Sequence, residues 1–330
     1  MINVLFTSAG RRVELLRLFK MAYKELGLKG SIVAVDIDPL APALQVADRV
    51  YIVPRVPDPD YVPTLVRICE REKIKLVFPL IDPDIPVLAV HKDEIESTGA
   101  RVVVVSQEAA AITQDKWLTY RFLRDLGIPT PKSWLPSEVD LAELPYPVFV
   151  KPRFGSAGKQ TSKVESPDEL SFYLKRVPDP LIQEFLPGPE ITNDVVCDFE
   201  GNVLGVVSRK RIEVRSGEVS KGKTVYHPEI IECCVKIAKG LKAIGPITIQ
   251  CMLREGRPYF TEINARFGGG VPLGIRAGVK SPHWLLALAS GQSVDIPPLG
   301  TYQTGLYLTR CDVSFFLSED DYAKIASSRL

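Results

Sequence analysis

The sequence predicts an α/β domain followed by an α+β region of antiparallel strands. Between Ile2 and about Ile112, short β-branched runs alternate with helical stretches, which is typical of a parallel, doubly wound sheet. Interior runs such as Val102 to Val105 are continuously apolar, as expected of strands covered on both faces. The first expected elements are a strand at Asn3 to Thr7, a helix at Arg11 to Leu26 and a strand at Ser31 to Asp36.

The pattern changes near Thr113, where we place the first domain boundary. A helix at Lys116 to Leu126 ends at Gly127, and Pro129 and Pro131 behind it form a rigid connector. Strands joined by glycine-containing turns follow, which favours antiparallel pairing. The expected strands are Val148 to Lys151, Leu181 to Gln183, Val195 to Asp198, Val203 to Ile212, Ile247 to Leu253 and Pro258 to Asn264, with helices at Pro167 to Lys175 and Pro228 to Ile244.

Composition excludes several classes of protein. The chain is 45% hydrophobic and 25% charged with a net charge of +1, so it has no surplus of basic charge for a nucleic acid backbone. No apolar run approaches the roughly 20 residues that span a bilayer. The apolar start from Ile2 to Thr7 is too short for a signal peptide, and the scattered cysteines form no zinc spacing. We therefore expect a cytoplasmic protein with no nucleic acid or membrane partner.

Two β-rich runs on either side of Glu255-Gly256 predict a hairpin with a polar face. Glu262 and Asn264 are two residues apart and face the same side of a strand, whereas Thr261 faces the other. A three-residue turn would place Gln250 directly opposite Glu262, and a two-residue turn would shift this pairing by one. One carboxylate and two amides suit a nucleotide-bound Mg²⁺. A solvated hairpin face is the alternative.

Two further cues precede this hairpin. An apolar strand ends at Lys151, and the loop Gly155-Ser156-Ala157-Gly158 can bring backbone N–H groups close to phosphate, although it lacks the P-loop spacing. The strand end Gln183-Glu184-Phe185-Leu186 runs into a proline-bracketed turn and Glu190, which could meet an adenine edge and ribose hydroxyls. A plain hairpin turn and an ordinary linker are the respective alternatives.

In this order the three cues resemble the ATP-grasp superfamily, in particular the ATP-binding halves of the carbamoyl phosphate synthase large subunit and related small carboxylate-amine ligases. The resemblance implies a Rossmann-like pre-ATP-grasp domain over residues 1–112, a small lobe or lid over 113–185 and a large lobe with the metal site over 186–330. It implies ATP and Mg²⁺, with Mn²⁺ as an alternative metal. The implied enzyme activates a carboxylate as an acyl phosphate and joins it to an amine, forming a carbon–nitrogen bond.

The site residues of the superfamily carry over one at a time. Position 250 is Gln where many members have Asp or Glu, which would weaken a second metal. A chain of this length also lacks the second half and the tunnel that carbamoyl phosphate synthesis needs, so we do not expect that activity. For the nucleotide, the resemblance implies Lys116 and Lys151 as phosphate-binding cations, Gly155 to Gln160 as a flap, Glu190 as the ribose-binding acid, and an adenine hinge formed by Gln183, Glu184, Phe185 and Leu186. For the metal and the reaction, it implies Gln250, Glu262 and Asn264 as metal ligands and Arg266 as the residue that steadies the transferred phosphoryl group.

A basic stretch lies between Ser208 and Val225. It holds six cations and two glycines in an otherwise neutral protein, which suggests a loop that closes over an anionic phosphate or carboxylate. Arg211 and Arg215 are candidates for gripping the acyl phosphate or the acid, and Lys223 is a further catalytic candidate. A solvated hairpin face is the alternative.

The first βα loop offers candidate substrate residues. Two cations, Arg11-Arg12, open the next helix against its dipole, and an anion bound to them and to the loop around Ser8 and Gly10 would remove that conflict. Asp36 ends the second strand and Asp82 follows the fourth, at the edge where open parallel sheets bind ligands. Turn capping is the alternative for both aspartates.

Two other functions are compatible with this sequence. A non-catalytic nucleotide-binding sensor would need neither Arg266 nor the basic stretch, and an ATP-grasp ligase or kinase with a non-amine acceptor would differ only at the acceptor. The expected partners are small-molecule carboxylate and amine substrates, and dimers are common in related proteins. The tail from Gly300 to Leu330 could add a strand pair to the second lobe or form an interface, and we favour the strand pair.

Overall fold

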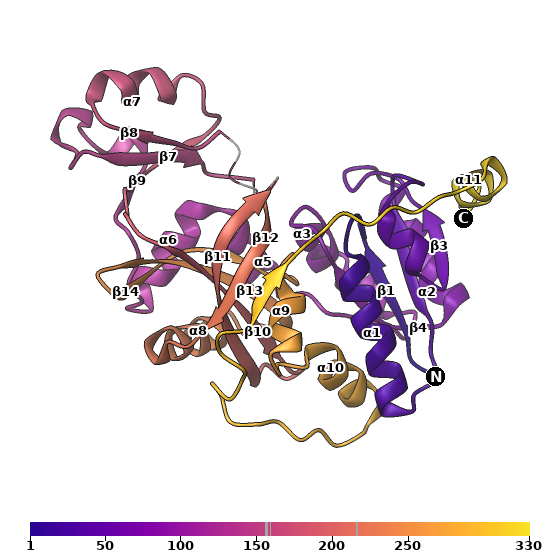
Figure 1. The fold of residues 1–330 in the computed structure, drawn as a ribbon. Helices are drawn as coiled ribbons and strands as arrows, with labels where there is room; N and C mark the ends of the chain where they lie inside the picture. Colours follow the sequence, from indigo (N-terminus) through magenta and orange to yellow (C-terminus); the bar gives the residue numbers. More distant parts are fainter. Residues whose placement is uncertain (156–157, 159, 216) are drawn as a thin grey trace.

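The computed structural model describes residues 1–155, 158, 160–215 and 217–330, in three sheets (Figure 1). The candidates Ser156 and Ala157 lie outside the described residues. In the part of the chain that is described, none of the helices is long and apolar enough to cross a membrane.

The first domain is a five-stranded parallel sheet in the order β3-β2-β1-β4-β5, which confirms the predicted α/β class. β1 is buried at all five positions because helices cover the sheet. The strands are β1 (Asn3–Thr7), β2 (Ile32–Asp36), β3 (Arg49–Ile52), β4 (Ile74–Pro79) and β5 (Arg101–Val102). The helices are α1 (Val13–Leu26), η1 (Pro42–Val46), α2 (Tyr61–Glu72), α3 (Asp84–Val90), α4 (Lys92–Glu96) and α5 (Gln107–Gln114).

Two predicted boundaries in this domain were wrong. α1 begins at Val13, so the arginines precede the helix, and β5 ends at Val102 although the apolar run continues to Val105. Val103 follows the end of β5, and its side chain packs beside Gly245, which belongs to the antiparallel sheet described below. Continuous burial therefore reflects tertiary packing here, and not a longer strand.

The large lobe is a six-stranded antiparallel sheet in the order β14-β13-β10-β11-β12-β15. Helix α6 packs on β14, and Phe260 N donates to Pro129 O at 2.8 Å just behind that helix, so α6 lies against the large lobe. The strands are β10 (Glu190–Cys197), β11 (Val203–Arg215), β12 (Glu218–Val225), β13 (Gly245–Arg254), β14 (Arg257–Asn264) and β15 (Tyr307–Thr309). The helices are α6 (Lys116–Asp125), α8 (Pro228–Gly240), α9 (Val271–Arg276) and α10 (Ser281–Ser290).

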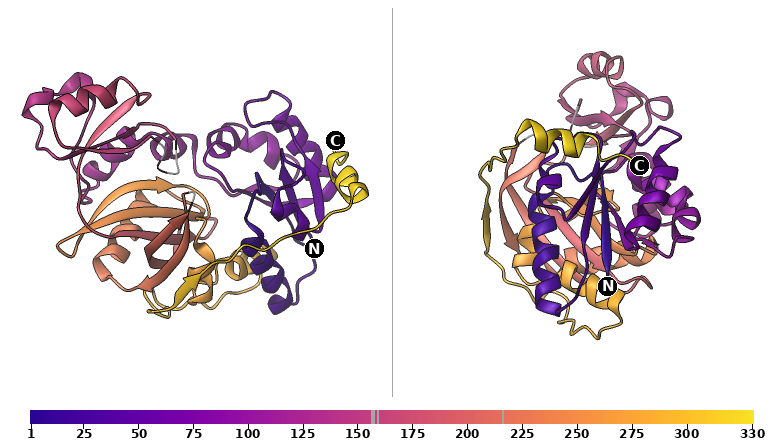
Figure 2. Two further views of the ribbon diagram at one scale, coloured as in Figure 1. Left: turned by 45° about the horizontal axis from the view of Figure 1, so that its top comes forward. Right: turned by 90° about the vertical axis from the view of Figure 1, so that its right-hand side faces the viewer.

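The small lobe is a four-stranded sheet in the order β6-β9-β7-β8, capped by α7 and set apart from the rest of the molecule (Figures 1 and 2). Its strands are β6 (Ser133–Trp134), β7 (Val148–Pro152), β8 (Ser162–Val164) and β9 (Pro180–Glu184). Its helices are η2 (Pro136–Glu138), η3 (Leu141–Glu143) and α7 (Pro167–Leu174). All the described pairings in the sheets of the two lobes are antiparallel, as predicted.

The β13–β14 hairpin combines a two-residue turn with the register expected of a three-residue turn. Glu255 and Gly256 form the turn with φ of 53° and 81°. A β-bulge at Thr261 then absorbs the extra residue, so Gln250 does pair with Glu262. The bulge also brings Thr261 to the same cleft as Glu262, whereas strict alternation predicted the opposite face.

The tail adds a single strand to the large lobe, and not the expected strand pair. After β15 the chain crosses to the first domain, where α11 (Glu319–Ala326) lies near β3 (Figures 1 and 2). Ile52 N donates to Ser328 O at 2.8 Å, and half-buried Leu330 packs on the apolar core. β3 is an edge strand, and the bond from Ile52 pairs one of its outward backbone groups with the tail.

Candidate functional site

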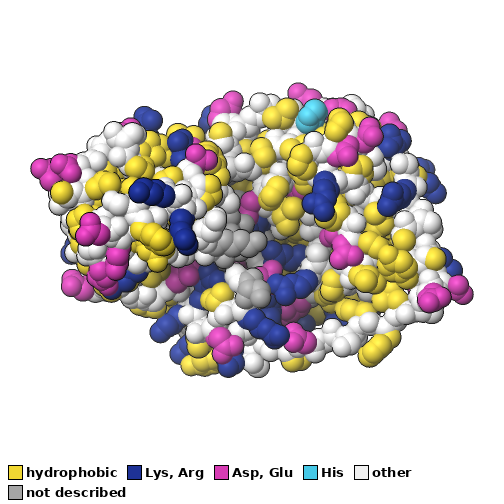
Figure 3. All heavy atoms as spheres, turned by 90° about the horizontal axis from the view of Figure 1, so that it is seen from above, with side chains coloured by type: hydrophobic (Ala, Val, Ile, Leu, Met, Phe, Trp, Pro, Cys, Tyr) yellow, Lys and Arg dark blue, Asp and Glu magenta, His cyan; other side chains and the backbone are white. Residues whose placement is uncertain are grey.

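A cleft of about 930 Å³ separates the small lobe from the large lobe and the first domain. Figure 3 shows the hollowed face, with Lys and Arg side chains gathered around its centre. Among the described residues, the predicted site residues that line the cleft are Arg11, Asp82, Lys116, Lys151, Gly155, Gly158, Gln183, Glu184, Phe185, Leu186, Glu190, Arg211, Gln250, Glu262, Asn264 and Arg266.

Lys151 stands at the end of β7 on the small-lobe wall and is only 7% exposed. Its Nζ donates to Gln183 Oε1 at 2.9 Å, and Gln183 Nε2 donates to Ser133 Oγ at 2.9 Å. Burial lowers the pKa of Lys151 to about 8, while the charge of Glu262 raises it and that of Lys116 lowers it. A buried cation without a carboxylate bonded to it is well suited to bind an anion from the cleft.

Lys116 lies at the base of the small lobe, beside an ion pair that joins the two lobes. Asp115 accepts backbone N–H groups at the start of α6 and also binds Arg153 through Nε at 2.7 Å and Nη2 at 2.5 Å. The Nζ of Lys116 donates to Gly155 O at 2.5 Å. The helix start that carries Lys116 is therefore tied to the loop that follows β7.

The strand end after β9 crosses between the lobes. Glu184 Oε1 accepts from Arg254 Nη1 at 2.5 Å, the ammonium of Lys163 lies 4.8 Å from the centroid of the Phe185 ring, and Leu186 is buried. The end of β9, Phe185 and the apolar Leu186 thus line one end of the cleft. A flat apolar base can stack there while its polar edge meets the backbone.

Glu190 begins β10 and binds two neighbours in the cleft. Its Oε1 accepts from Arg211 Nη1 at 2.6 Å and from Gln250 Nε2 at 2.5 Å, and Arg211 Nη2 also donates to Gly217 O at 3.1 Å. The carboxylate therefore sits between the basic hairpin β11–β12 and the hairpin β13–β14. Ribose hydroxyls could donate to its remaining lone pairs.

The three predicted metal ligands meet on one face of β13 and β14. Gln250 and Glu262 are paired across the strands, and Asn264 follows two residues later. No group of three or more His, Cys, Asp or Glu side chains among the described residues is arranged to hold a metal ion. One carboxylate with two amide oxygens fits a Mg²⁺ that shares its coordination with phosphates and water better than a fully protein-bound ion.

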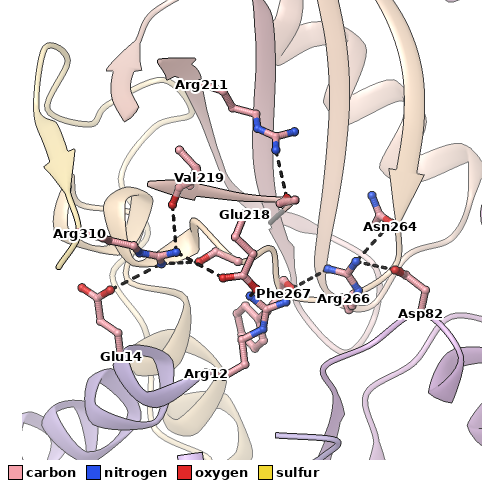
Figure 4. A network of polar contacts seen from close by, with 12 residues as sticks. Arg12, Glu14, Asp82, Arg211, Glu218, Val219, Asn264, Arg266, Phe267 and Arg310 are labelled. Carbon is pink, nitrogen blue, oxygen red and sulfur yellow. Dashed lines mark hydrogen bonds and ion pairs between the residues drawn. The ribbon is translucent and has the colours of Figure 1, made fainter. Parts of the chain in front are cut away.

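Arg266 and Asp82 pair with each other across the junction of the large lobe and the first domain (Figure 4). Arg266 Nη2 donates to Asp82 Oδ2 at 2.6 Å, and Nη1 donates to Phe267 O at 3.1 Å. Arg266 Nε and Asp82 Oδ1 are buried without a hydrogen-bond partner among the described atoms. The pair thus keeps unused hydrogen-bonding capacity, which a rearrangement on ligand binding could satisfy.

The first βα loop is organised by carboxylates of its own domain. Ser8 Oγ donates to Asp84 Oδ1 at 3.0 Å, and burial raises the pKa of Asp84 to about 6. Gly10 N donates to Asp36 Oδ2 at 2.7 Å, and Asp38 N donates to Asp36 Oδ1 at 3.1 Å. Ser8, Gly10 and Asp36 do not belong to the described lining of the cleft, and Asp36 caps the loop.

The two arginines before α1 lie at the first-domain end of the cleft. Arg12 forms an ion pair with a carboxylate of the protein itself, because its Nη1 lies 3.0 Å from Glu218 Oε1 of β12. Arg11 is exposed and lines the cleft. The sequence could not reveal Glu218 as this partner, since the two residues are distant along the chain.

The structure does not bring Arg215 and Lys223 into the cleft. Arg215 pairs with Asp312 at 3.1 Å and is 72% exposed. Lys223 lies opposite Lys210, one position from Arg211, and its ammonium is 5.0 Å from the Tyr307 ring centroid. Alternation explains Lys223, because it lies opposite Lys210 and so on the other side of the sheet from Arg211. For Arg215 the cause is the irregular register around Glu213, after which Val214 and not Arg215 lines the cleft.

A run of three glycines after Arg266 forms part of the cleft that sequence reasoning missed. A Cβ on Gly270 would lie 2.2 Å from Arg209 Nη1, and one on Gly269 would lie 2.6 Å from Arg12 Nη1. Arg209 is 2% exposed and binds Asp194 through Nε at 2.5 Å and Nη2 at 2.8 Å. The three consecutive glycines in the sequence could have indicated this part of the cleft, because a backbone that packs this closely against a side chain requires glycine.

Two family models match consecutive parts of the chain. Residues 4–103 match the PylC-like N-terminal domain, and residues 113–270 match the ATP-grasp domain. The second match contains the whole set of nucleotide and metal candidates from Lys116 to Arg266.

Similar proteins agree with these matches. The carbamoyl phosphate synthase large chain of Thermoanaerobacter sp. (strain X514) is 26% identical over 307 residues, which are 87% of this chain but only 28% of that relative. The biotin carboxylase domain of Hydrogenobacter thermophilus 2-oxoglutarate carboxylase, solved as a dimer with MgADP, ADP and bicarbonate, has a TM-score of 0.73 at 20% identity and covers 93% of this chain and 73% of its own. L-amino acid ligase from Bacillus licheniformis has a TM-score of 0.68 at 21% identity, with 88% and 74% covered. The two structures show that the fold is shared.

Proposed function

Because the chain belongs to the ATP-grasp superfamily, we propose that it is an ATP-dependent carboxylate-amine ligase that forms an acyl phosphate, joins the acyl group to an amine and releases ADP and phosphate. The observation that carries this proposal is the convergence of the nucleotide, metal and phosphoryl candidates on one cleft, although they come from five strands of two sheets and from the start of α6.

ATP would lie between the two lobes. The adenine would contact Leu186 and the backbone of β9, and the ribose would contact Glu190. Lys151 and Lys116 would bind phosphate oxygens, since both ammonium groups stand at the small-lobe wall of the same cleft. Mg²⁺ on Glu262, Asn264 and Gln250 would neutralise phosphate charge, and Mn²⁺ could replace it.

The first step would be attack of a substrate carboxylate oxygen on the γ-phosphorus, with ADP as the leaving group. Arg266 stands beside the metal candidates and would stabilise the charge on the transferred phosphoryl group. Asp82 would orient Arg266, because it holds one end of that guanidinium.

The second step would be attack of the amine nitrogen on the carbonyl carbon of the acyl phosphate, with phosphate leaving. Arg211 lines the cleft beside Glu190 and would grip the acid or its phosphate. Arg11 and Asp82, at the first-domain end, would contact the second substrate. Closure of the small lobe would exclude water, which would otherwise hydrolyse the acyl phosphate.

The remaining candidates take other places in the proposal. Ser8, Gly10 and Asp36 would shape the loop that presents Arg11, because their contacts are made inside the first domain. Arg215 and Lys223 would reach substrate only if the β11–β12 hairpin moved, since both face away from the described cleft. We further propose a cytoplasmic enzyme that acts on small molecules, with a homodimer as its assembly.

The test has two arms. Calorimetry with MgADP should detect binding to the wild type, and Glu262→Ala with Asn264→Ala should weaken it when Mg²⁺ is present while leaving metal-free ADP binding much less affected. ADP release should then be measured from MgATP with pools of amino acids and of sugar acids. Release that no pool stimulates, with nucleotide binding intact, would favour a nucleotide sensor. Stimulated release without a new carbon–nitrogen bond would favour a kinase or a ligase with a different acceptor.

A further inference from the structure

Arg310 lies just after β15, outside both ranges that match family models and outside the described lining of the cleft. Its backbone is fixed on the edge of the large lobe, because β15 pairs with β12 and Arg310 N donates to Ser220 O at 3.0 Å. Its side chain therefore starts from a defined position behind the cleft.

The guanidinium of Arg310 joins three parts of the molecule (Figure 4). Nη2 donates to Gly269 O at 2.6 Å, and Nη1 donates to Val219 O at 3.2 Å. Carboxylate oxygens of Glu218 and Glu14 lie 3.6 Å and 3.7 Å away. A planar fork can hold carbonyl and carboxylate oxygens of different elements at fixed angles, which a lysine cannot do.

Three of the four residues that the Arg310 guanidinium contacts also line the cleft, and two of them lead to Arg12. Glu218 and Gly269 both line the cleft, and Glu218 is the residue that binds Arg12 at 3.0 Å. A Cβ on Gly269 would lie 2.6 Å from Arg12 Nη1, so this backbone packs directly against the Arg12 guanidinium. A shift of Gly269 or Glu218 would therefore move Arg12.

Arg12 and Arg310 share the charge of Glu218. Burial lowers the pKa of Arg12, Glu218 raises it, and the nearby cations Arg266 and Arg310 lower it again. Glu218 lies near both guanidinium groups, whereas Glu14 lies near Arg310 only, so among the described contacts Arg12 at the wall of the cleft has no carboxylate of its own. Such a group is favourably placed to attract an anionic ligand.

We infer that Arg310 is a positioning residue for the reaction: through Glu218 and Gly269 it holds Arg12 at the first-domain end of the cleft, where an anionic group of the substrate binds. The C-terminal segment thereby becomes part of the substrate site without lining it. This inference rests on the proposed function, because it needs a substrate that occupies that end of the cleft. The proposed nucleotide end lies on β7, β9, β10, β13 and β14, and none of the described polar contacts of Arg310 is with these strands.

The experiment compares Arg310→Ala with Asp312→Ala in the full chain. Asp312 lies on the same segment and pairs with Arg215 of the β11–β12 hairpin, but its side chain is 85% exposed. We expect Arg310→Ala to lower ADP release stimulated by the active acid pool by roughly tenfold or more, as misplaced binding groups do. The KM for MgATP and the Kd for MgADP should stay within about twofold of wild type, Arg310→Lys should recover part of the loss, and Asp312→Ala should match wild type.

A double-mutant cycle with Glu218→Gln tests the route of the effect. If Arg310 acts through Glu218, its removal should cost much less in the Glu218→Gln background than in wild type. The inference would be overturned if Arg310→Ala lowered stimulated ADP release equally in both backgrounds. It would also be overturned if Arg310→Ala and Asp312→Ala behaved alike, or if Arg310→Ala weakened MgADP binding as much as it lowered ADP release. Should Arg310→Ala fail to fold, Arg310→Lys takes its place in the comparison and in the double-mutant cycle, where the same selective but smaller loss is expected. A wild type without MgADP binding or stimulated ADP release would instead overturn the proposed function, and the inference with it.

Discussion

The small lobe and the large lobe form opposite walls of one cleft, but their apolar residues are buried in different ways. The small lobe has a separate core that includes Val148, Val164 and Leu170. The large lobe shares its core with the first domain, since one cluster contains residues of β1, β4, β10 and β13. Phe267 extends this sharing into a second cluster, with ring centroids 5.6 Å from Phe78 and 6.0 Å from Phe19.

This difference indicates which wall can move. A separately packed lobe can rotate without opening an apolar core, whereas separating the first domain from the large lobe would expose both shared clusters. The metal and phosphoryl candidates therefore stand on the wall that shares its core with the first domain, and Lys151 stands on the wall with a core of its own. Four predictions test this comparison.

Phe267→Ala should produce the largest effect, a loss of about 3–5 kcal/mol in the free energy of unfolding, because it removes a fully buried ring between two parts of the chain. Urea denaturation monitored by circular dichroism measures this loss. Phe172→Ala, which removes a half-exposed ring on the small lobe, is the control and should cost less than about 1 kcal/mol. Equal costs would show that the first domain and the large lobe are not joined by a continuous core.

Leu170→Ala should cost about 2–5 kcal/mol, but only within the small lobe, because its buried side chain belongs to the separate core of that lobe. Hydrogen exchange should accelerate across residues 133–184 while the amides of β1 and β10 keep their protection. Leu65→Ala, in the shared core, is the matched control and should weaken protection in both the first domain and the large lobe. Similar exchange maps for the two variants would contradict the separation of the cores.

Asp115→Ala should cost about 2 kcal/mol, because it removes a helix cap and the two bonds to Arg153 at the join of the lobes. Asp115→Asn should lose less, since an amide oxygen can still cap α6. Urea denaturation and limited proteolysis near Arg153 provide the measurements. Lys163→Ala is the control, because it breaks an exposed pair with Glu165 and should change stability by less than about 1 kcal/mol. If it cost as much as Asp115→Ala, the Asp115–Arg153 pair would stabilise the protein no more than an ordinary surface pair.

Lys151 should make nucleotide binding depend on pH. Because burial lowers the pKa of Lys151 to about 8, the free protein loses this charge as the pH rises through that value. The Kd for MgADP should therefore rise about tenfold between pH 7 and pH 9. Lys151→Arg keeps its charge in this range and should show a nearly flat profile. A flat wild-type profile would mean that the ammonium does not bind phosphate across the cleft.

Short-range patterns were sufficient for much of the fold. Alternating β-branched and helical stretches predicted the parallel sheet, and glycine-containing turns predicted the antiparallel lobes. The order of the cues also placed Lys151, Glu190 and Glu262 in the region that matches the ATP-grasp domain. These signals succeed because strand period, turn chemistry and motif spacing are properties of neighbouring residues.

Contacts between distant segments were decided by tertiary structure alone. The bulge at Thr261 restored a register that turn length by itself would have shifted. Pairing of Asp82 with Arg266, and of Arg12 with Glu218, depends on how the first domain docks on the large lobe. Local sequence determined which elements form, because their hydrogen bonds and periodicity are local; only burial of the shared core determined which charges meet, since each pairing depends on the position of a whole domain.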